Sequence, residues 1–152
     1  MSEQQRGVRG IDHIIVLVRG DRIEEVAAQW RSTLGLQFDD MTDEAIGVRV
    51  IIDLDSGIEL IAPLGEFGSH GAFFTKYIEE NGEGLQSVVF RVDDLDAATQ
   101  RATEAGSTVL RHYEPSGTEP YAHRYDVFKE NALSPINGVF VSLAQLQKKP
   151  GH

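Results

Sequence analysis

The most informative segment of this chain is Gly57-Ile58-Glu59-Leu60-Ile61-Ala62-Pro63. It places one carboxylate, that of Glu59, inside an otherwise apolar run with the length of a β-strand. A strand that is apolar on both faces is normally buried on both faces, and a buried carboxylate there is costly unless a partner compensates its charge. The segment therefore predicts a strand whose Glu59 faces a metal, a ligand or a second polar side chain.

A second segment, Ile11-Asp12-His13-Ile14-Ile15-Val16-Leu17-Val18, has the same character, with His13 as its central polar residue. Its β-branched residues favour a strand. If the two strands are neighbours in one sheet, His13 and Glu59 converge. The alternatives are a buried structural histidine at position 13 and an edge strand that leaves Glu59 in solvent.

Composition excludes several classes of function. The chain has 24 acidic and 14 basic residues and a net charge of −10, which opposes nucleic-acid binding but allows an anionic small organic molecule in a locally basic pocket. It has no cysteine, so it has no disulfide, thiolate metal site or thiol nucleophile. We find no apolar run long enough for a bilayer and no signal peptide, and expect a cytoplasmic protein with no membrane partner.

The order of predicted elements repeats. The first half is read as a strand at 11–18, a helix at 22–33, a short strand at 36–40, an acidic turn at 39–44, and strands at 47–54 and 58–62. The second half is read as strands at 85–92, 109–113, 123–129 and 138–144, with a helix at 95–105 and a loop at 130–137. We expect Asp21 to cap the first helix, Gly35 to end it, and Asp93 or Asp94 to cap the second.

This repetition predicts an internal duplication of the α+β class. One domain at 10–146 is expected, made of module one at 10–64, a connector at 65–83 with a helix at 72–81, and module two at 84–146. Residues 1–9 and 147–152 are expected to be flexible tails. We expect the tandem βαβββ modules to close into an incomplete, cup-shaped mixed β-barrel with helices outside, whose mouth suits a ligand.

The duplicated pattern resembles the vicinal oxygen chelate superfamily, which includes glyoxalase I, methylmalonyl-CoA epimerase, extradiol dioxygenases and bleomycin-resistance proteins. Its markers are Ile11-Asp12-His13-Ile14, Leu34-Gly35-Leu36, Gly57 to Pro63, Gly84 to Asp94, and Asn137-Gly138-Val139-Phe140-Val141-Ser142-Leu143. The epimerase branch is nearest, from Glu59-Leu60-Ile61-Ala62-Pro63, Phe73-Phe74 and Gly82-Glu83-Gly84-Leu85. The resemblance also implies a homodimer, with Phe73-Phe74 as a candidate contact.

The resemblance implies a site as well. Metal-dependent members carry ligands on the first, fourth, fifth and eighth strands, and these positions fall on His13, Glu59, Ser87 and Ser142. Because hydroxyls are poor ligands for divalent ions, we expect no resident cofactor, with Co, Mn, Zn, Ni or Fe as the alternative. Ser87 and Ser142 are then candidate substrate-binding residues. Neither lies in a Gly-Xaa-Ser-Xaa-Gly motif, so a serine hydrolase is not indicated.

Four further residues, Tyr113, Tyr121, His123 and Arg124, cluster around a loop of the second module and are candidates for substrate binding, or ordinary surface residues.

Three functions are compatible with the sequence. The first is a metal-independent isomerase or lyase in which Glu59 and His13 transfer protons. The second is a binding protein that sequesters a ligand, as bleomycin-resistance proteins do. The third is a divergent metal-dependent epimerase that completes its ligand set with water or His123.

Overall fold

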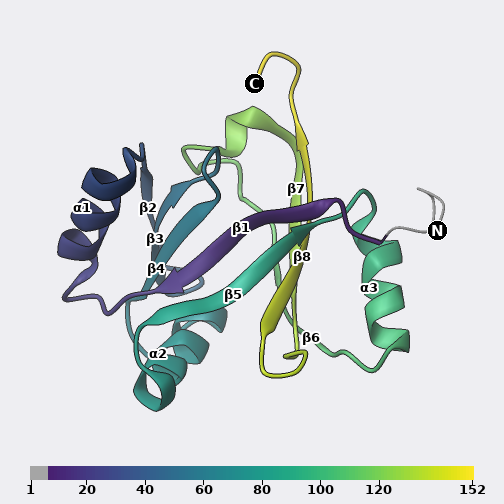
Figure 1. The fold of residues 1–152 in the computed structure, drawn as a ribbon, viewed down its shortest axis with the longest axis horizontal. Helices are drawn as coiled ribbons and strands as arrows, with labels where there is room; N and C mark the ends of the chain where they lie inside the picture. Colours follow the sequence, from purple (N-terminus) through teal and green to yellow (C-terminus); the bar gives the residue numbers. More distant parts are fainter. Residues whose placement is uncertain (1–6) are drawn as a thin grey trace. The chain divides into compact units, whose positions relative to one another are not determined.

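The computed structural model describes residues 7–152, which fall into two compact units (Figure 1). The N-terminal unit covers residues 13–86, and the C-terminal unit covers residues 87–152 together with 7–12. Both contain a strand, a helix and three further strands in that order, so the mixed α+β class and the tandem βαβββ order are confirmed. Within residues 7–152, no helix has the length and apolar character needed to cross a membrane.

The N-terminal unit is built around a four-stranded sheet in the order β2-β3-β4-β1. Its elements are β1 (Gly10–Leu17), α1 (Ile23–Leu34), β2 (Asp39–Asp43), β3 (Val48–Asp53), β4 (Ile58–Pro63) and α2 (Ser69–Asn81). β1 runs parallel to β4, and the other neighbouring pairs are antiparallel. The apolar stripe of α1, including Ile23, Ala27 and Trp30, packs against buried residues of β1 and β4. One face of the sheet is thereby covered by α1.

The segment before α2 is tightly packed through its glycines. Gly68 has φ +74°, and a Cβ there would lie 2.4 Å from the carbonyl carbon of Ile46. On α2 itself, Phe74 is only 2% exposed. The expected dimer contact at Phe73-Phe74 is therefore wrong for Phe74, whose ring is buried inside its own unit beside Phe73.

The C-terminal unit repeats the arrangement with the strand order β5-β8-β7-β6. Its elements are β5 (Gly84–Arg91), α3 (Leu95–Glu104), β6 (Val109–Tyr113), a 3-10 turn (Ala122–Arg124), β7 (Tyr125–Leu133) and β8 (Phe140–Lys148). β5 is parallel to β8, as β1 is to β4. Leu95 of α3 packs with Val92, Leu133 and Leu143 in the core of this unit. Asp94 caps α3 as predicted, its Oδ1 accepting the Ala97 N–H at 3.0 Å.

Three local predictions are corrected. The N-cap of α1 is Arg22 rather than Asp21, and it makes no side-chain capping bond, because Asp21 contacts Arg19 instead. Asp39–Asp43 is strand β2 rather than a turn, paired with β3 along its whole length. β7 and β8 run past their predicted ends to Leu133 and Lys148, because residues 130–132 of β7 pair with residues 142–144 of β8, and residues 145–148 of β8 pair with residues 125–129 of β7. Gly35 ends α1 as predicted, with φ +68°.

Candidate functional site

His13 and Glu59 meet on one face of the N-terminal sheet. Strand pairing sets Ile15 of β1 beside Glu59 of β4, and His13, two residues before Ile15, lies on the same face. The His13 Nε2 is 3.1 Å from the Glu59 Oε2. The His13 side chain is 1% exposed and that of Glu59 is 14% exposed. The imidazole is therefore the partner that compensates the mid-strand carboxylate.

This pair lies away from the packed core under α1. The residues of β1 and β4 that contact α1 are the alternate ones, such as Val16 and Leu60, which point to the opposite face. Glu59 makes no further hydrogen bond or ion pair within residues 7–152, so its Oε1 is available to a ligand. The arrangement is a carboxylate held by one oxygen and open at the other.

The C-terminal unit carries serines at the equivalent positions. Ser142 of β8 pairs with Val89 of β5, just as Glu59 pairs with Ile15, and Ser87 precedes Val89 by two residues as His13 precedes Ile15. Ser87 is 4% exposed and Ser142 is 2% exposed. The same register in the two units thus presents an imidazole and a carboxylate in one and two hydroxyls in the other.

Two of the other predicted site residues come together. The hydroxyls of Tyr113 and Tyr121 are 2.5 Å apart, and the ring of Phe128 packs against both tyrosines. Tyr121 is 3% exposed, so its ring belongs to the interior of the unit. The tyrosine pair is a partly buried hydroxyl dyad beside an aromatic cluster.

His123 and Arg124 lie on the 3-10 turn after Tyr121. His123 is exposed, and its ring contacts that of His152 at 5.9 Å. Arg124 donates its backbone N–H to the Tyr121 carbonyl at 3.0 Å. The two residues therefore follow Tyr121 in the chain. Within the described residues, the one ring contact of His123 is with His152.

Comparison with known proteins now places the chain. A family model described as the glyoxalase/bleomycin resistance protein/dioxygenase superfamily matches residues 12–126. The chain belongs to this superfamily. The resemblance predicted from the sequence markers is thus confirmed.

Epimerases are among the similar proteins. This superfamily member is 34% identical over 109 residues to the ethylmalonyl-CoA/methylmalonyl-CoA epimerase of Cereibacter sphaeroides. The aligned region covers 69% of this chain and 77% of that relative. Its fold matches methylmalonyl-CoA epimerase from Mycobacterium tuberculosis with a TM-score of 0.69 at 23% identity, over 96% of this chain and 92% of that one. A variant of the Streptomyces coelicolor epimerase in complex with 2-nitronate-propionyl-CoA gives a TM-score of 0.69 at 23% identity, over 91% and 97% of the two chains.

The residues present do not fit the metal centre of the metal-dependent superfamily members. The 3.1 Å between the His13 Nε2 and the Glu59 Oε2 suits two ligands of one ion, since donors about 2.1 Å from a metal at a right angle lie about 3 Å apart. However, residues 7–152 contain no group of three or more His, Asp or Glu side chains arranged to hold an ion. A protein metal site generally uses at least three such ligands.

The sequence analysis missed a charged pair in the C-terminal unit. Strand pairing sets Arg111 beside Ala132, and Tyr113 beside Glu130, so these side chains share one face of the sheet. Burial lowers the pKa of Arg111, and the charge of Glu130 opposes this shift. Glu130 was expected in a loop because β7 was predicted to end at position 129. No apolar–polar alternation runs through residues 128–133, and the extension of the strand depends on pairing with β8.

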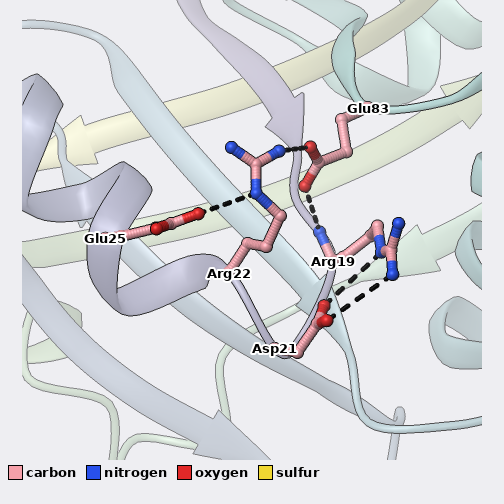
Figure 2. Close-up of polar contacts among 5 residues, drawn as sticks. All are labelled: Arg19, Asp21, Arg22, Glu25 and Glu83. Carbon is pink, nitrogen blue, oxygen red and sulfur yellow. Dashed lines mark hydrogen bonds and ion pairs between the residues drawn. The ribbon is translucent and has the colours of Figure 1, made fainter.

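A second unpredicted cluster surrounds Glu83 (Figure 2). The Glu83 Oε2 accepts the Arg19 backbone N–H at 2.8 Å, and its Oε1 binds the Arg22 guanidinium. The Arg22 Nε also donates to Glu25 at 2.8 Å. Within the N-terminal unit, Glu83 thus ties the loop that follows β1 to the Gly82-Glu83-Gly84 turn that precedes β5.

Gln86 is the remaining unexpected feature. It is 4% exposed, and neither amide atom of its side chain has a hydrogen-bond partner within residues 7–152. Strand alternation directs it to the face opposite Ser87.

Proposed function

We propose that this protein is an isomerase of the epimerase type, which moves a proton at the carbon next to the thioester carbonyl of a small acyl-coenzyme A substrate. The observation that carries the proposal is the contact of His13 and Glu59, with 3.1 Å between Nε2 and Oε2. The 34% identity to an ethylmalonyl-CoA/methylmalonyl-CoA epimerase supports the choice of substrate class. A largely buried carboxylate beside a histidine is a workable acid–base pair at neutral pH.

In the proposed reaction, Glu59 is the general base. Its Oε1 has no partner within residues 7–152 and accepts the proton from the substrate carbon, leaving an enolate. The His13 Nε2 holds the Glu59 Oε2, which fixes the direction of the carboxylate, and supplies the proton that is returned to carbon. One proton leaves one face of the substrate carbon and one arrives at the other face, so the substrate changes only its configuration, and the proton held by Glu59 then passes to His13 across their contact and restores the pair.

We propose that this proton transfer is independent of a metal. The donor set supports this, because the family's third and fourth ligand positions hold the hydroxyls of Ser87 and Ser142. We also propose substrate-binding roles for Ser87, Ser142, Tyr113, Tyr121, His123 and Arg124. The homodimer and the cytoplasmic location stay predictions. Of the Phe73-Phe74 pair, only Phe73, which is half-buried, is exposed enough to contact a partner.

The decisive experiment measures deuterium incorporation from D2O into ethylmalonyl-CoA and methylmalonyl-CoA by NMR and mass spectrometry, with the metal content of the same sample measured in parallel. We expect exchange in protein stripped of metal by a chelator. Glu59→Gln should slow it by about 10²–10⁴-fold, and His13→Gln by a similar factor. Glu66→Gln, an exposed carboxylate of the same unit, is the matched control and should leave the rate unchanged.

Each contrary result has a defined meaning. Exchange that requires added Co²⁺ or Zn²⁺ contradicts metal independence and keeps the epimerase. Normal exchange in Glu59→Gln contradicts the assignment of the base.

Ligand sequestration is the second candidate function, and the two hydroxyls at ligand positions favour it. It is the conclusion to draw if no exchange occurs with or without metal while a ligand binds. A cationic ligand suits the net charge of −10.

A further inference from the structure

An apolar groove of about 680 Å³ lies between α3 and the sheet of the C-terminal unit. We call it the α3 groove. Its sheet side is formed by Val88, Phe90 and Val141, and its helix side by Ala98, Ala102 and Ala105. Its volume falls within the range of about 300–1,000 Å³ that is usual for small-molecule sites. Neither His13 nor Glu59 lines it, so it is separate from the proposed proton-transfer site.

The groove exists because α3 carries small residues where α1 carries large ones. Both helices begin with a buried aliphatic residue, Ile23 in α1 and Leu95 in α3. Three residues further on, α1 has Val26 and α3 has Ala98; seven residues further on, α1 has Trp30 and α3 has Ala102. The methyl groups of α3 leave the sheet surface beneath them incompletely covered.

One charged side chain lines the groove, that of Arg101. It is exposed and makes no ion pair or side-chain hydrogen bond within residues 7–152, whereas Arg9 of the same unit pairs with Asp93 at 2.5 Å. The guanidinium lies close to Gly7, where a Cβ would be 2.1 Å from the Arg101 Nη1. No acidic residue lines the groove, although the chain has 24.

These features have the chemistry of a site for an amphipathic anion. The rim is apolar and open to solvent, with Ile136 54% exposed and Val139 50% exposed. An apolar chain gains free energy by leaving water for such a surface, while an anionic head group gains from the free guanidinium at its edge. A cationic head group would meet Arg101 and be repelled.

We propose that the α3 groove binds a long-chain carboxylate of the fatty acid class, with its methylene chain against Val88, Phe90 and Val141 and its carboxylate on Arg101. Each buried methylene contributes about 0.8 kcal/mol, which is about fourfold in affinity. The carboxylate at an exposed arginine contributes about two- to fivefold.

The test is calorimetric titration of the full chain with octanoate, decanoate and dodecanoate below their micellar concentrations. We expect affinity to rise about fourfold per methylene. Arg101→Gln should weaken dodecanoate binding two- to fivefold and leave dodecan-1-ol binding unchanged. Ala102→Trp, which gives α3 the residue of α1, should abolish binding of both. Glu104→Trp is the matched control, since it adds the same ring at an exposed position of α3 outside the groove.

Three results would overturn the proposal: affinity that does not depend on chain length, binding that survives Ala102→Trp, or dodecan-1-amine that binds as tightly as dodecanoate. If circular dichroism shows that Ala102→Trp is unfolded, Ala105→Trp at the exposed end of the helix replaces it. Amide NMR supplies an independent readout. Dodecanoate should shift Val139 and Val141 and leave Ile15 of the other unit unchanged, and the reverse pattern contradicts the site.

Discussion

Opposite Ile15, the N-terminal unit carries a carboxylate, and opposite Val89, the C-terminal unit carries a hydroxyl. Strand order, the parallel first and last strands and the pairing register are the same in both units. The backbone positions are therefore equivalent, and the difference lies in the side chains alone. Under the proposed function, acid–base chemistry belongs to one unit, and the other keeps only hydrogen-bonding groups at those positions.

The helices differ in how completely they cover their sheets, and here the C-terminal unit has the more accessible surface. In the N-terminal unit, Trp30 packs against the sheet, and the hollow beside it, of about 320 Å³, is lined by residues of α1 only. In the C-terminal unit, Ala102 at the corresponding position borders a groove of about 680 Å³ that reaches the sheet. One fold thus holds its polar pair on one sheet and its accessible apolar surface on the other. Substitutions that exchange these features between the units test whether the side chains alone account for the difference.

The largest expected effect on stability comes from the helix positions. Trp30→Ala should lower the free energy of unfolding by about 2–3 kcal/mol, somewhat less than for a fully buried tryptophan because Trp30 is half-buried. The equivalent Ala102→Gly should cost only about 1 kcal/mol, the difference in helix propensity. Urea unfolding of both variants measures this. Equal losses would show that Trp30 does not hold α1 on its sheet.

The next effect concerns the serines. Ser87→His combined with Ser142→Glu gives the C-terminal unit the side chains of its counterpart in the same register. We expect the double variant to lose about 1–3 kcal/mol of the free energy of unfolding, because Ser87 is 4% and Ser142 2% exposed and larger side chains overpack the interior there. Urea unfolding measures the loss. The control, Thr103→His with Thr118→Glu at exposed positions, should lose less than about 0.5 kcal/mol, and a loss equal to that of the buried pair would contradict the prediction.

A smaller effect is expected from partial filling of the α3 groove. Ala102→Leu adds apolar volume against the sheet and should raise the free energy of unfolding by about 0.5–1 kcal/mol. Denaturant unfolding measures the change, and Glu104→Leu, outside the groove, is the control. A clear loss of stability in Ala102→Leu would mean that the groove is too narrow for a larger side chain.

The smallest effect is a pH dependence at His112. Its hydrogen bond to Asn131 and its contact with Glu114 raise the pKa of His112 above 6.5. The protonated form is favoured in the folded state, so the stabilisation is complete below the unfolded pKa and is lost as pH rises through the folded pKa. Because the side chain is 49% exposed, we expect less than about 0.5 kcal/mol. His112→Gln should therefore lose more stability at pH 5.5 than at pH 8, and a difference that does not change with pH would contradict this.

Much of the fold could be predicted because it depends on local pattern. The apolar runs around His13 and Glu59, the glycine at position 35 and the cap at Asp94 act within a few residues, and each is found where predicted. The errors arose where contacts outside the local sequence pattern decide. Asp21 fits a cap, yet it contacts Arg19 while Arg22 binds Glu83 across 61 residues. Asp39–Asp43 has the composition of a turn, yet pairing with β3 makes it a strand.

The sequence by itself determined the duplicated element order, the superfamily, and the presence of a histidine and a carboxylate on two buried strands. Only the tertiary structure decided that the two side chains lie 3.1 Å apart and that Ser142 holds the position of Glu59. It also decided that alanines on α3 leave a groove beside Arg101. The periodicity of apolar residues depends on neighbours along the chain, so it can be recognised in the sequence. Distances and uncovered surface depend on how strands align and how side chains of separate segments fill the space between them.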